Sequence, residues 1–124
     1  MQVRSSAEDY LETILLLSKK TGAVRSIDIV EEMGFSKPSV SVAMKKLREN
    51  EMISVDGEGF ITLTRKGEEA AEQVYERHST LYDWLIGIGI SAKTAAADAC
   101  RMEHILSEET FEGIKKLLEN KQEK

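Results

Sequence analysis

The order of helical and strand-like patterns in the first half of the chain constrains the fold more than any other feature. Three segments have apolar residues at helical spacing, residues 5–19, 27–33 and 37–50. Two short segments that alternate apolar and polar residues follow at 52–55 and 60–64, and the sequence DGEG between them is typical of a hairpin turn. Helix, helix, tight turn at Gly34, helix and hairpin, in this order, predict a winged helix-turn-helix.

The second half predicts three further helices. The longest begins between Thr64 and Gly67 and ends near Ile88, because Gly87 and Gly89 interrupt it. Its inner positions alternate steps of three and four, which is the seam of a helix that packs against another helix: Ala71, Val74, His78, Leu81, Leu85 and Ile88. Two shorter helices are expected over 92–106 and 108–120. Ser5 or Ser6 is predicted to cap the first helix, and four further serines are predicted to cap later helices, namely Ser26, Ser36, Ser91 and Ser107.

These patterns predict a mainly α fold, a winged helix-turn-helix followed by a helical dimerisation domain. We expect the DNA-binding domain at residues 1–66 and the helical metal-binding and dimerisation domain at residues 67–124. No basic start followed by an apolar run is visible, and the longest apolar stretches, 14–17 and 84–90, fall far short of the ~20 residues that cross a bilayer. The single Cys100 excludes an internal disulfide, so we expect a cytoplasmic protein.

The net charge of −5 argues at first against nucleic acid, but its distribution matters more. Residues 1–66 hold ten Lys/Arg and ten Asp/Glu, whereas residues 67–124 hold seven and twelve. Every charged residue within 37–48 is basic. The third helix therefore presents small hydroxyl and basic side chains for a DNA groove, and Arg25 before the second helix can hold a phosphate. The predicted DNA-binding residues are Arg25, Ser36, Lys37, Pro38, Ser39, Ser41, Val42, Lys45 and Lys46.

Two ordinary explanations compete with this interpretation. Helix-turn-helix shapes also serve as protein-interaction modules. Lys45 and Lys46 are equally compatible with a solvated helix face.

The residues that bind transition metals have helical spacing. Cys100, Glu103 and His104 stand at positions i, i+3 and i+4, so a helix projects thiolate, carboxylate and imidazole from one face. Asp9 and Glu12 share a face of the first helix, and His78 lies on the buried seam, where a polar ring needs a partner. The predicted metal ligands are Asp9, Glu12, His78, Cys100, Glu103 and His104.

Each of these residues also has a simpler explanation. A lone Cys on a helix is often core filler, a buried His often donates to a backbone carbonyl, and Asp9 and Glu12 could complement the dipole of the first helix. A structural zinc site would normally show two or more Cys. No HExxH motif, Ser-His-Asp pattern or Gly-rich phosphate loop stands out, so we expect no enzyme and no catalytic residues.

Four segments resemble a known family: AEDYLETI at 7–14, SKPSVSVAMKKL at 36–47, YERH at 75–78 and DACRMEHILS at 98–107. Through them the chain resembles, nearly end to end, the diphtheria-toxin-repressor family of metal-dependent transcription repressors, especially its short manganese-transport-regulator branch. The resemblance implies an N-terminal winged helix and C-terminal helices that form a homodimer and hold the metal. Longer members carry a third, SH3-like domain, which this chain is expected to lack.

Five of the predicted ligands match ligand positions of the manganese branch: Asp9, Glu12, His78, Glu103 and His104. Cys100 departs from that branch, which carries Glu there, and matches the iron-responsive branch. The iron branch in turn carries Met and Arg at the positions of Asp9 and Glu12, and a His at the position of Ala96. The chain thus resembles a hybrid of the two branches.

We therefore predict a metal-dependent transcription repressor that binds double-stranded operator DNA as a homodimer when a divalent transition metal joins its two domains. Mn²⁺ and Fe²⁺ are the favoured cofactors, and Zn²⁺ and Co²⁺ are further candidates. The resemblance implies metal-uptake genes as targets, and neither a membrane nor a small organic substrate is expected as a partner. A metal-independent winged-helix regulator that answers another signal and a protein-interaction module without DNA remain the alternatives.

Overall fold

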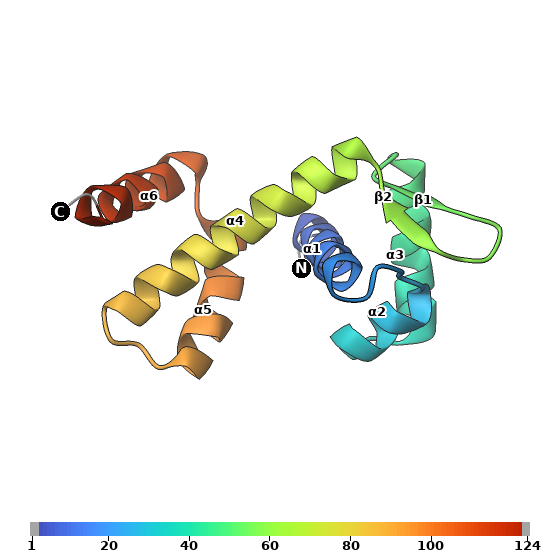
Figure 1. Cartoon of the computed structure of the whole chain (residues 1–124), viewed down its shortest axis with the longest axis horizontal. Coiled ribbons are helices and arrows are strands. Elements are labelled where there is room, and N and C mark those ends of the chain that lie inside the picture. The colour runs from blue at the N-terminus through green and yellow to red at the C-terminus, as the bar shows by residue number, and fades with distance from the viewer. Residues whose placement is uncertain (1–2, 123–124) are drawn as a thin grey trace. The chain divides into compact units, whose positions relative to one another are not determined.

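A computed structural model describes residues 3–122 of the chain, with side chains from residue 7 to residue 120. The chain divides into two compact units, Met1–Val74 and Tyr75–Lys124. The elements labelled in Figure 1 are, in order, α1 (Val3–Thr21), α2 (Ser26–Met33), α3 (Lys37–Glu49), β1 (Ile53–Val55), β2 (Ile61–Leu63), α4 (Arg65–Gly87), α5 (Ala92–Ile105) and α6 (Glu108–Gln122). The predicted mainly α fold is confirmed. The domain boundary expected after residue 66 falls at the start of α4 and stays a prediction.

Helix ends follow the expected capping chemistry with two exceptions. The prediction that Ser5 or Ser6 caps the first helix is wrong, because α1 already begins at Val3. Ser36 and Ser91 are the N-caps of α3 and α5, and Ser107 accepts a hydrogen bond from the backbone N–H of Thr110 in the first turn of α6. The prediction that Ser26 caps α2 is wrong, because the cap is Arg25. The Asp28 carboxylate accepts the backbone N–H of Arg25 at 2.9 Å, so the helix begins one residue earlier.

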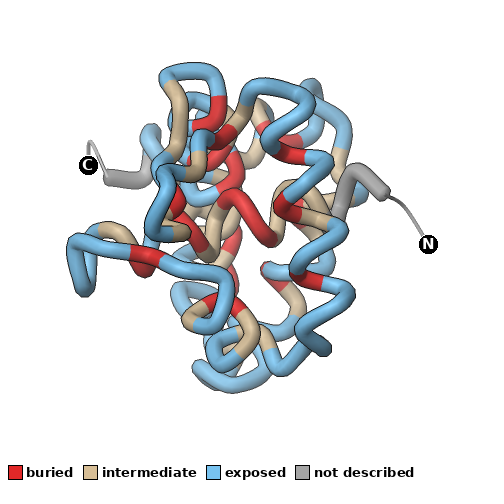
Figure 2. Tube along the Cα trace, turned by 90° about the vertical axis from the view of Figure 1, so that its right-hand side faces the viewer, coloured by how far each residue is buried: buried red, intermediate tan, exposed pale blue. Residues whose placement is uncertain are grey.

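The first unit is built around an apolar core to which α1, α2, α3, the hairpin and the start of α4 all contribute. The buried positions, red in Figure 2, include Leu11, Ile14, Ile29, Val40, Met44, Leu47, Ile53, Ile61 and Ala71. On α3, Val40, Met44 and Leu47 recur every three or four residues, so one face of this helix is buried and the other stays in solvent. The opening turn of α4 lies so close to Met52 that a side chain at Gly67 would clash with the Met52 carbonyl oxygen.

The hairpin is short and regular. β1 and β2 pair antiparallel with Ser54 opposite Thr62, and a carboxylate oxygen of Asp56 accepts the backbone N–H groups of Glu58 and Phe60, both at 2.9 Å. The N–H of Ile61 also donates to the Val24 carbonyl at 2.7 Å, which ties β2 to the segment before α2. This hairpin is the wing of the fold, and the bond at Ile61 links it to the residue before Arg25.

The second unit has a smaller apolar core. Its cluster of buried residues consists of Leu81, Leu85, Ala95 and Ala99, with Tyr82, Trp84 and Met102 among the partly buried side chains around it. The predicted seam of α4 is largely found, but Ile88 lies beyond the end of the helix and is 56% exposed. Within the described residues, no helix is long and apolar enough to span a membrane.

Candidate functional site

The exposed face of α3 carries the residues predicted to bind DNA. The exposed residues predicted to bind DNA are Lys37, Pro38, Ser39, Ser41, Val42, Lys45 and Lys46, and the cap Ser36 is exposed as well. Arg48 and Glu49 are also exposed on α3. The first turn, residues 37–40, contains no acidic residue, so the partial positive charge of the helix N-terminus is not neutralised there. Two basic residues, Lys46 and Arg48, lie in the last turn. This face suits a polyanion.

The hydroxyl groups at the start of α3 also have a structural task. The Ser36 hydroxyl oxygen accepts the backbone N–H of Ser39 at 3.3 Å, and this hydroxyl donates to that of Ser39 at 2.9 Å. Pro38 stands in the first turn, where its missing N–H costs nothing. Ser36 therefore fixes where the helix begins, whatever else it contacts.

Arg25 has a partner that the sequence did not reveal. Its guanidinium carbon lies 4.3 Å from the centre of the Phe60 ring, which is cation–π distance. Phe60 precedes β2, and the bridge between Val24 and Ile61 brings the two residues together. The ring holds the exposed guanidinium beside the wing, which is a suitable position for a backbone phosphate.

A second aromatic contact joins α1 to the turn before α3. The rings of Tyr10 and Phe35 meet edge to face, with centroids 5.9 Å apart. Tyr10 is 5% exposed and burial raises its pKa, whereas Phe35 is 47% exposed. Tyr10 stands on α1 beside Asp9, and Phe35 precedes the cap Ser36. The helix that carries two predicted ligands therefore supports the start of the predicted recognition helix.

Asp9 and Glu12 lie one helical turn apart on α1 and are both half-buried. Their backbone spacing puts both carboxylates on one face of the helix, as expected from the sequence. These two residues belong to the first unit, and the other four predicted ligands belong to the second.

In the second unit, the predicted ligands of α5 converge. Cys100, Glu103 and His104 each offer one ligand atom, and these atoms lie within 4.8 Å of one another. Cys100 is exposed and His104 is half-buried, so the cluster reaches from the surface toward the core. Thiolate, carboxylate and imidazole at this spacing form a donor set for a transition metal.

Glu103 is the unusual member of this cluster. Its side chain is 1% exposed, and it is the only buried charged or polar residue in the described part of the chain. One carboxylate oxygen lies 3.4 Å from Nδ1 of His78, and the other lies 3.4 Å from Nε2 of His104. Neither oxygen accepts a hydrogen bond from any described residue.

A divalent cation fits these residues. A carboxylate taken out of water without hydrogen bonds is costly, and positive charge at that point offsets the cost. Imidazole nitrogens from two helices face its two oxygens, and neutral imidazole nitrogen is a common metal donor. The ring of His78 also stacks on Tyr82 at a centroid distance of 6.4 Å, which restricts its orientation.

Two family models cover most of the chain. Residues 2–59 match "Iron dependent repressor, N-terminal DNA binding domain", and residues 64–124 match "Iron dependent repressor, metal binding and dimerisation domain". The chain is 33% identical over 112 residues to the transcriptional regulator MntR of Escherichia coli O157:H7, which covers 90% of this chain and 72% of that protein. It is 32% identical over 121 residues to an uncharacterised HTH-type transcriptional regulator of Methanocaldococcus jannaschii, covering 96% and 97%.

Solved structures agree with these matches. The manganese regulator SloR superposes with a TM-score of 0.81 at 30% identity, covering 91% of this chain and 53% of that one. A manganese-dependent transcriptional repressor in complex with manganese superposes with a TM-score of 0.83 at 27% identity, covering 90% and 52%. This chain thus spans about half the length of these two solved regulators.

These findings confirm the winged helix-turn-helix fold and the prediction of a transcription regulator rather than an enzyme. Sequence reasoning missed the contacts of Tyr10, Phe35 and Phe60, since periodicity marks such residues only as apolar. The chain belongs to the diphtheria-toxin-repressor family of iron-dependent and other metal-dependent transcription repressors, in its manganese-regulator-like branch.

Proposed function

We propose that this chain is a repressor that binds operator DNA as a homodimer when one or more divalent transition metals occupy a site formed by Asp9, Glu12, His78, Cys100, Glu103 and His104. The observation that carries the proposal is the buried Glu103 carboxylate. It faces two imidazoles at 3.4 Å, and neither of its oxygens accepts a hydrogen bond within the described residues. A group of this kind is costly to keep in a core unless a cation is bound there.

Each residue has a separate role in the proposed site. His78 supplies an imidazole from α4, where its ring stacks on Tyr82, and Glu103 supplies the buried carboxylate from α5. His104 and Cys100 complete the set on α5, and the thiolate makes it softer than a purely oxygen and nitrogen site. Asp9 and Glu12 supply carboxylates from one face of α1, one helical turn apart. When bound, the cation supplies the positive charge that neutralises these carboxylates.

Control of DNA binding follows from linkage. A cation bound by ligands of both units favours conformations in which those ligands converge over conformations in which they separate. The cation can shift that equilibrium only by its difference in affinity for the two states. A coupling of about 1–3 kcal/mol would tighten DNA binding roughly five- to 150-fold. Within the first unit, the Tyr10–Phe35 contact connects α1 to the start of α3.

The DNA contacts are proposed for the exposed residues of α3 and for Arg25. Phosphates are contacted by the exposed lysines of this helix, Lys37, Lys45 and Lys46. Base edges in the major groove are approached by its smaller exposed side chains, Ser39, Ser41 and Val42. In a homodimer, two such helices reach successive major grooves about 34 Å apart. We further propose Mn²⁺ or Fe²⁺ as the natural cofactor, metal-uptake genes as targets and the cytoplasm as the place of action.

One experiment separates this proposal from its alternatives. Duplexes that bind the untagged protein are selected from a random library in the presence of Mn²⁺, and their affinity is then measured by fluorescence anisotropy during separate titrations with Mn²⁺, Fe²⁺, Co²⁺ and Zn²⁺. We expect one enriched sequence with two-fold symmetry and at least fivefold weaker binding when a chelator removes the metal.

The other outcomes identify the alternatives. Affinity that a chelator leaves unchanged would indicate a metal-independent regulator. Failure to enrich any sequence at any metal concentration would indicate a protein-interaction module. His78→Ala is the matching variant, and we expect it to remain dimeric in analytical ultracentrifugation while its DNA affinity no longer responds to Mn²⁺.

A further inference from the structure

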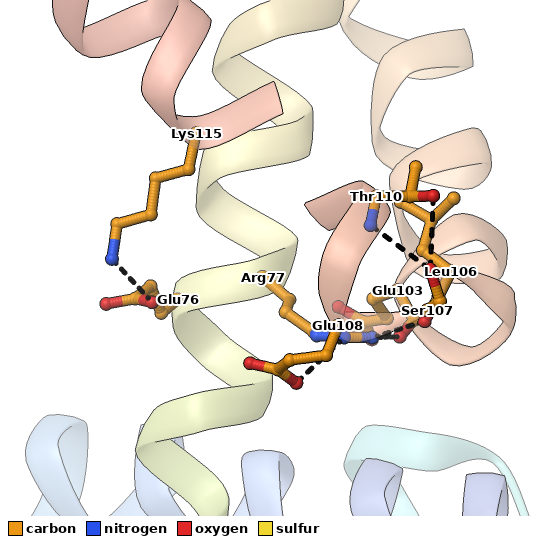
Figure 3. Close-up of polar contacts among 8 residues, drawn as sticks. All are labelled: Glu76, Arg77, Glu103, Leu106, Ser107, Glu108, Thr110 and Lys115. Atoms are coloured by element: carbon orange, nitrogen blue, oxygen red, sulfur yellow. Dashed lines mark hydrogen bonds and ion pairs between the residues drawn. The ribbon is translucent and has the colours of Figure 1, made fainter. Parts of the chain in front are cut away.

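Arg77, the residue before His78, makes contacts that the site described above does not use. Its Nη1 donates to the backbone carbonyl of Glu103 at 2.8 Å and to that of Leu106 at 3.1 Å, and its Nη2 lies 3.4 Å from a carboxylate oxygen of Glu108 (Figure 3). The guanidinium carbon is also 5.1 Å from the centre of the Phe111 ring. One side chain of α4 thus contacts the end of α5 and the first turns of α6.

The geometry points to Arg77 as a positioning residue for the metal site. Two adjacent residues of α4 contact Glu103, one at its backbone and the other at its side chain. Arg77 holds the backbone carbonyl, and His78 lies against the side-chain carboxylate. This inference rests on the proposed function, since it assigns to Arg77 the task of fixing a predicted ligand before the cation arrives.

The physical reason lies in how α5 ends. The last carbonyl groups of a helix have no partner within the helix. Here the N–H of Leu106 satisfies the Met102 carbonyl at 3.1 Å, and the next carbonyl, that of Glu103, is satisfied by Arg77. The positive charge of the Arg77 guanidinium also offsets the partial negative charge at the C-terminus of α5. The backbone at Glu103 is therefore fixed relative to α4, which stabilises one orientation of its buried carboxylate.

The same guanidinium extends this restraint to α6. The side chain of Arg77 is only 20% exposed. It contacts the carbonyl oxygens of Glu103 and of the α5 C-cap Leu106, the Phe111 ring and the exposed carboxylate of Glu108. Phe111 is 2% exposed, so its ring is a fixed surface rather than a mobile one. Any displacement of Glu103 on metal binding is thereby transmitted to the start of α6, in the part of the chain that matches a dimerisation domain.

The chain offers a matched control in the same helix. One residue before Arg77, Glu76 accepts a hydrogen bond at 3.2 Å from Lys115 of α6, and this bond raises the pKa of the Lys115 amino group. This pair also joins α4 to α6, but it involves no atom of α5 (Figure 3). If Arg77 acted only by tying helices together, removing Lys115 would have a similar effect on the metal site.

The test measures metal affinity, with Mn²⁺ and Zn²⁺ as probes in competition with a chromogenic chelator, for the full chain and four variants. We expect Arg77→Met to weaken metal binding about ten- to 100-fold, the usual effect of removing a group that orients a ligand. Arg77→Lys keeps the charge and one donor, so its loss should be smaller. Glu108→Gln and Lys115→Met should bind metal like the wild type. Thermal unfolding without metal, followed by circular dichroism, shows whether each variant is folded.

The outcomes are distinguishable. If the wild type binds neither Mn²⁺ nor Zn²⁺, the proposed function fails. If the wild type binds and Arg77→Met binds equally well, only the role of Arg77 is overturned. Equal losses in Arg77→Met and Lys115→Met would also overturn it, because they would assign the effect to general stability. If Arg77→Met does not fold, the metal affinity of Arg77→Lys is the deciding measurement. Wild-type metal affinity in Arg77→Lys, together with a lowered unfolding temperature, would reject a positioning role for Arg77.

Discussion

The two units of the chain place their charged residues differently. In the described part of the first unit every charged side chain is exposed or half-buried, and the core is an apolar cluster of thirteen buried residues. The second unit has a buried apolar cluster of four residues and, near it, the buried carboxylate of Glu103. The first unit resembles an ordinary small domain stabilised by apolar burial, whereas the second contains a buried charge whose desolvation cost a bound cation would offset.

The largest effect should come from the core of the first unit. Ile14 is 0% exposed, so Ile14→Ala should lower the free energy of unfolding of this unit by about 2–5 kcal/mol. Trp84 is the only tryptophan and packs in the second unit, so its fluorescence reports that unit while circular dichroism reports both. In urea, the circular dichroism transition should shift and the Trp84 transition should not.

A control on the same helix makes this test specific. Leu16 is 43% exposed, and Leu16→Ala should change stability by no more than about 0.5 kcal/mol. If Ile14→Ala moved both transitions by the same amount, the units would unfold as one, and the contrast between their cores would not describe two independent stabilities.

The next effect tests the buried charge. Glu103→Gln keeps the shape and removes the charge, so without metal the second unit should become more stable by about 1–3 kcal/mol, measured by Trp84 fluorescence in urea. Adding Mn²⁺ should stabilise the wild type and leave the variant unchanged. Glu119→Gln, an exposed carboxylate on α6, is the control and should behave like the wild type. A variant that lost stability without metal would show that Glu103 needs no cation.

Most of the fold was predictable from the sequence because its signals are local. The buried stripe of α3, the caps Ser36 and Ser91 and the hairpin all lie within a few residues of the features that predict them. The missed cap at α2 is local too, since the Asp28 carboxylate that fixes it is three residues away.

The site was predictable only in part. Periodicity places Cys100, Glu103 and His104 on one helix face, but it does not show that Glu103 is the buried member. Arg77 was missed because its partners are a backbone carbonyl 26 residues away and a ring on α6. Backbone acceptors leave no trace in residue type, so a sequence pattern cannot predict such contacts.

A smaller effect concerns which metal the second unit prefers. Cys100→Glu replaces a soft thiolate by a hard carboxylate, which should shift the ratio of Mn²⁺ to Zn²⁺ affinity toward Mn²⁺ by roughly tenfold, equivalent to about 1.4 kcal/mol. The Co²⁺ complex of the wild type should show a thiolate-to-metal charge-transfer band, and those of Cys100→Glu and the control Cys100→Ser should not. Identical metal preferences in all three proteins would leave Cys100 as a packing residue.

The smallest expected effect concerns DNA binding by the exposed charged residues of the first unit. Lys45 is exposed on α3, so Lys45→Ala should leave stability unchanged and weaken DNA binding on all sequences. If it contacts one phosphate, the slope of log affinity against log salt should fall in magnitude by about 1, because one fewer counterion is released. Lys20→Ala, an exposed lysine at the end of α1, should leave that slope unchanged. An unaltered slope for Lys45→Ala would show that this residue contacts no phosphate. Equal changes of slope in Lys45→Ala and Lys20→Ala would mean that the first unit attracts DNA by its general charge rather than through α3.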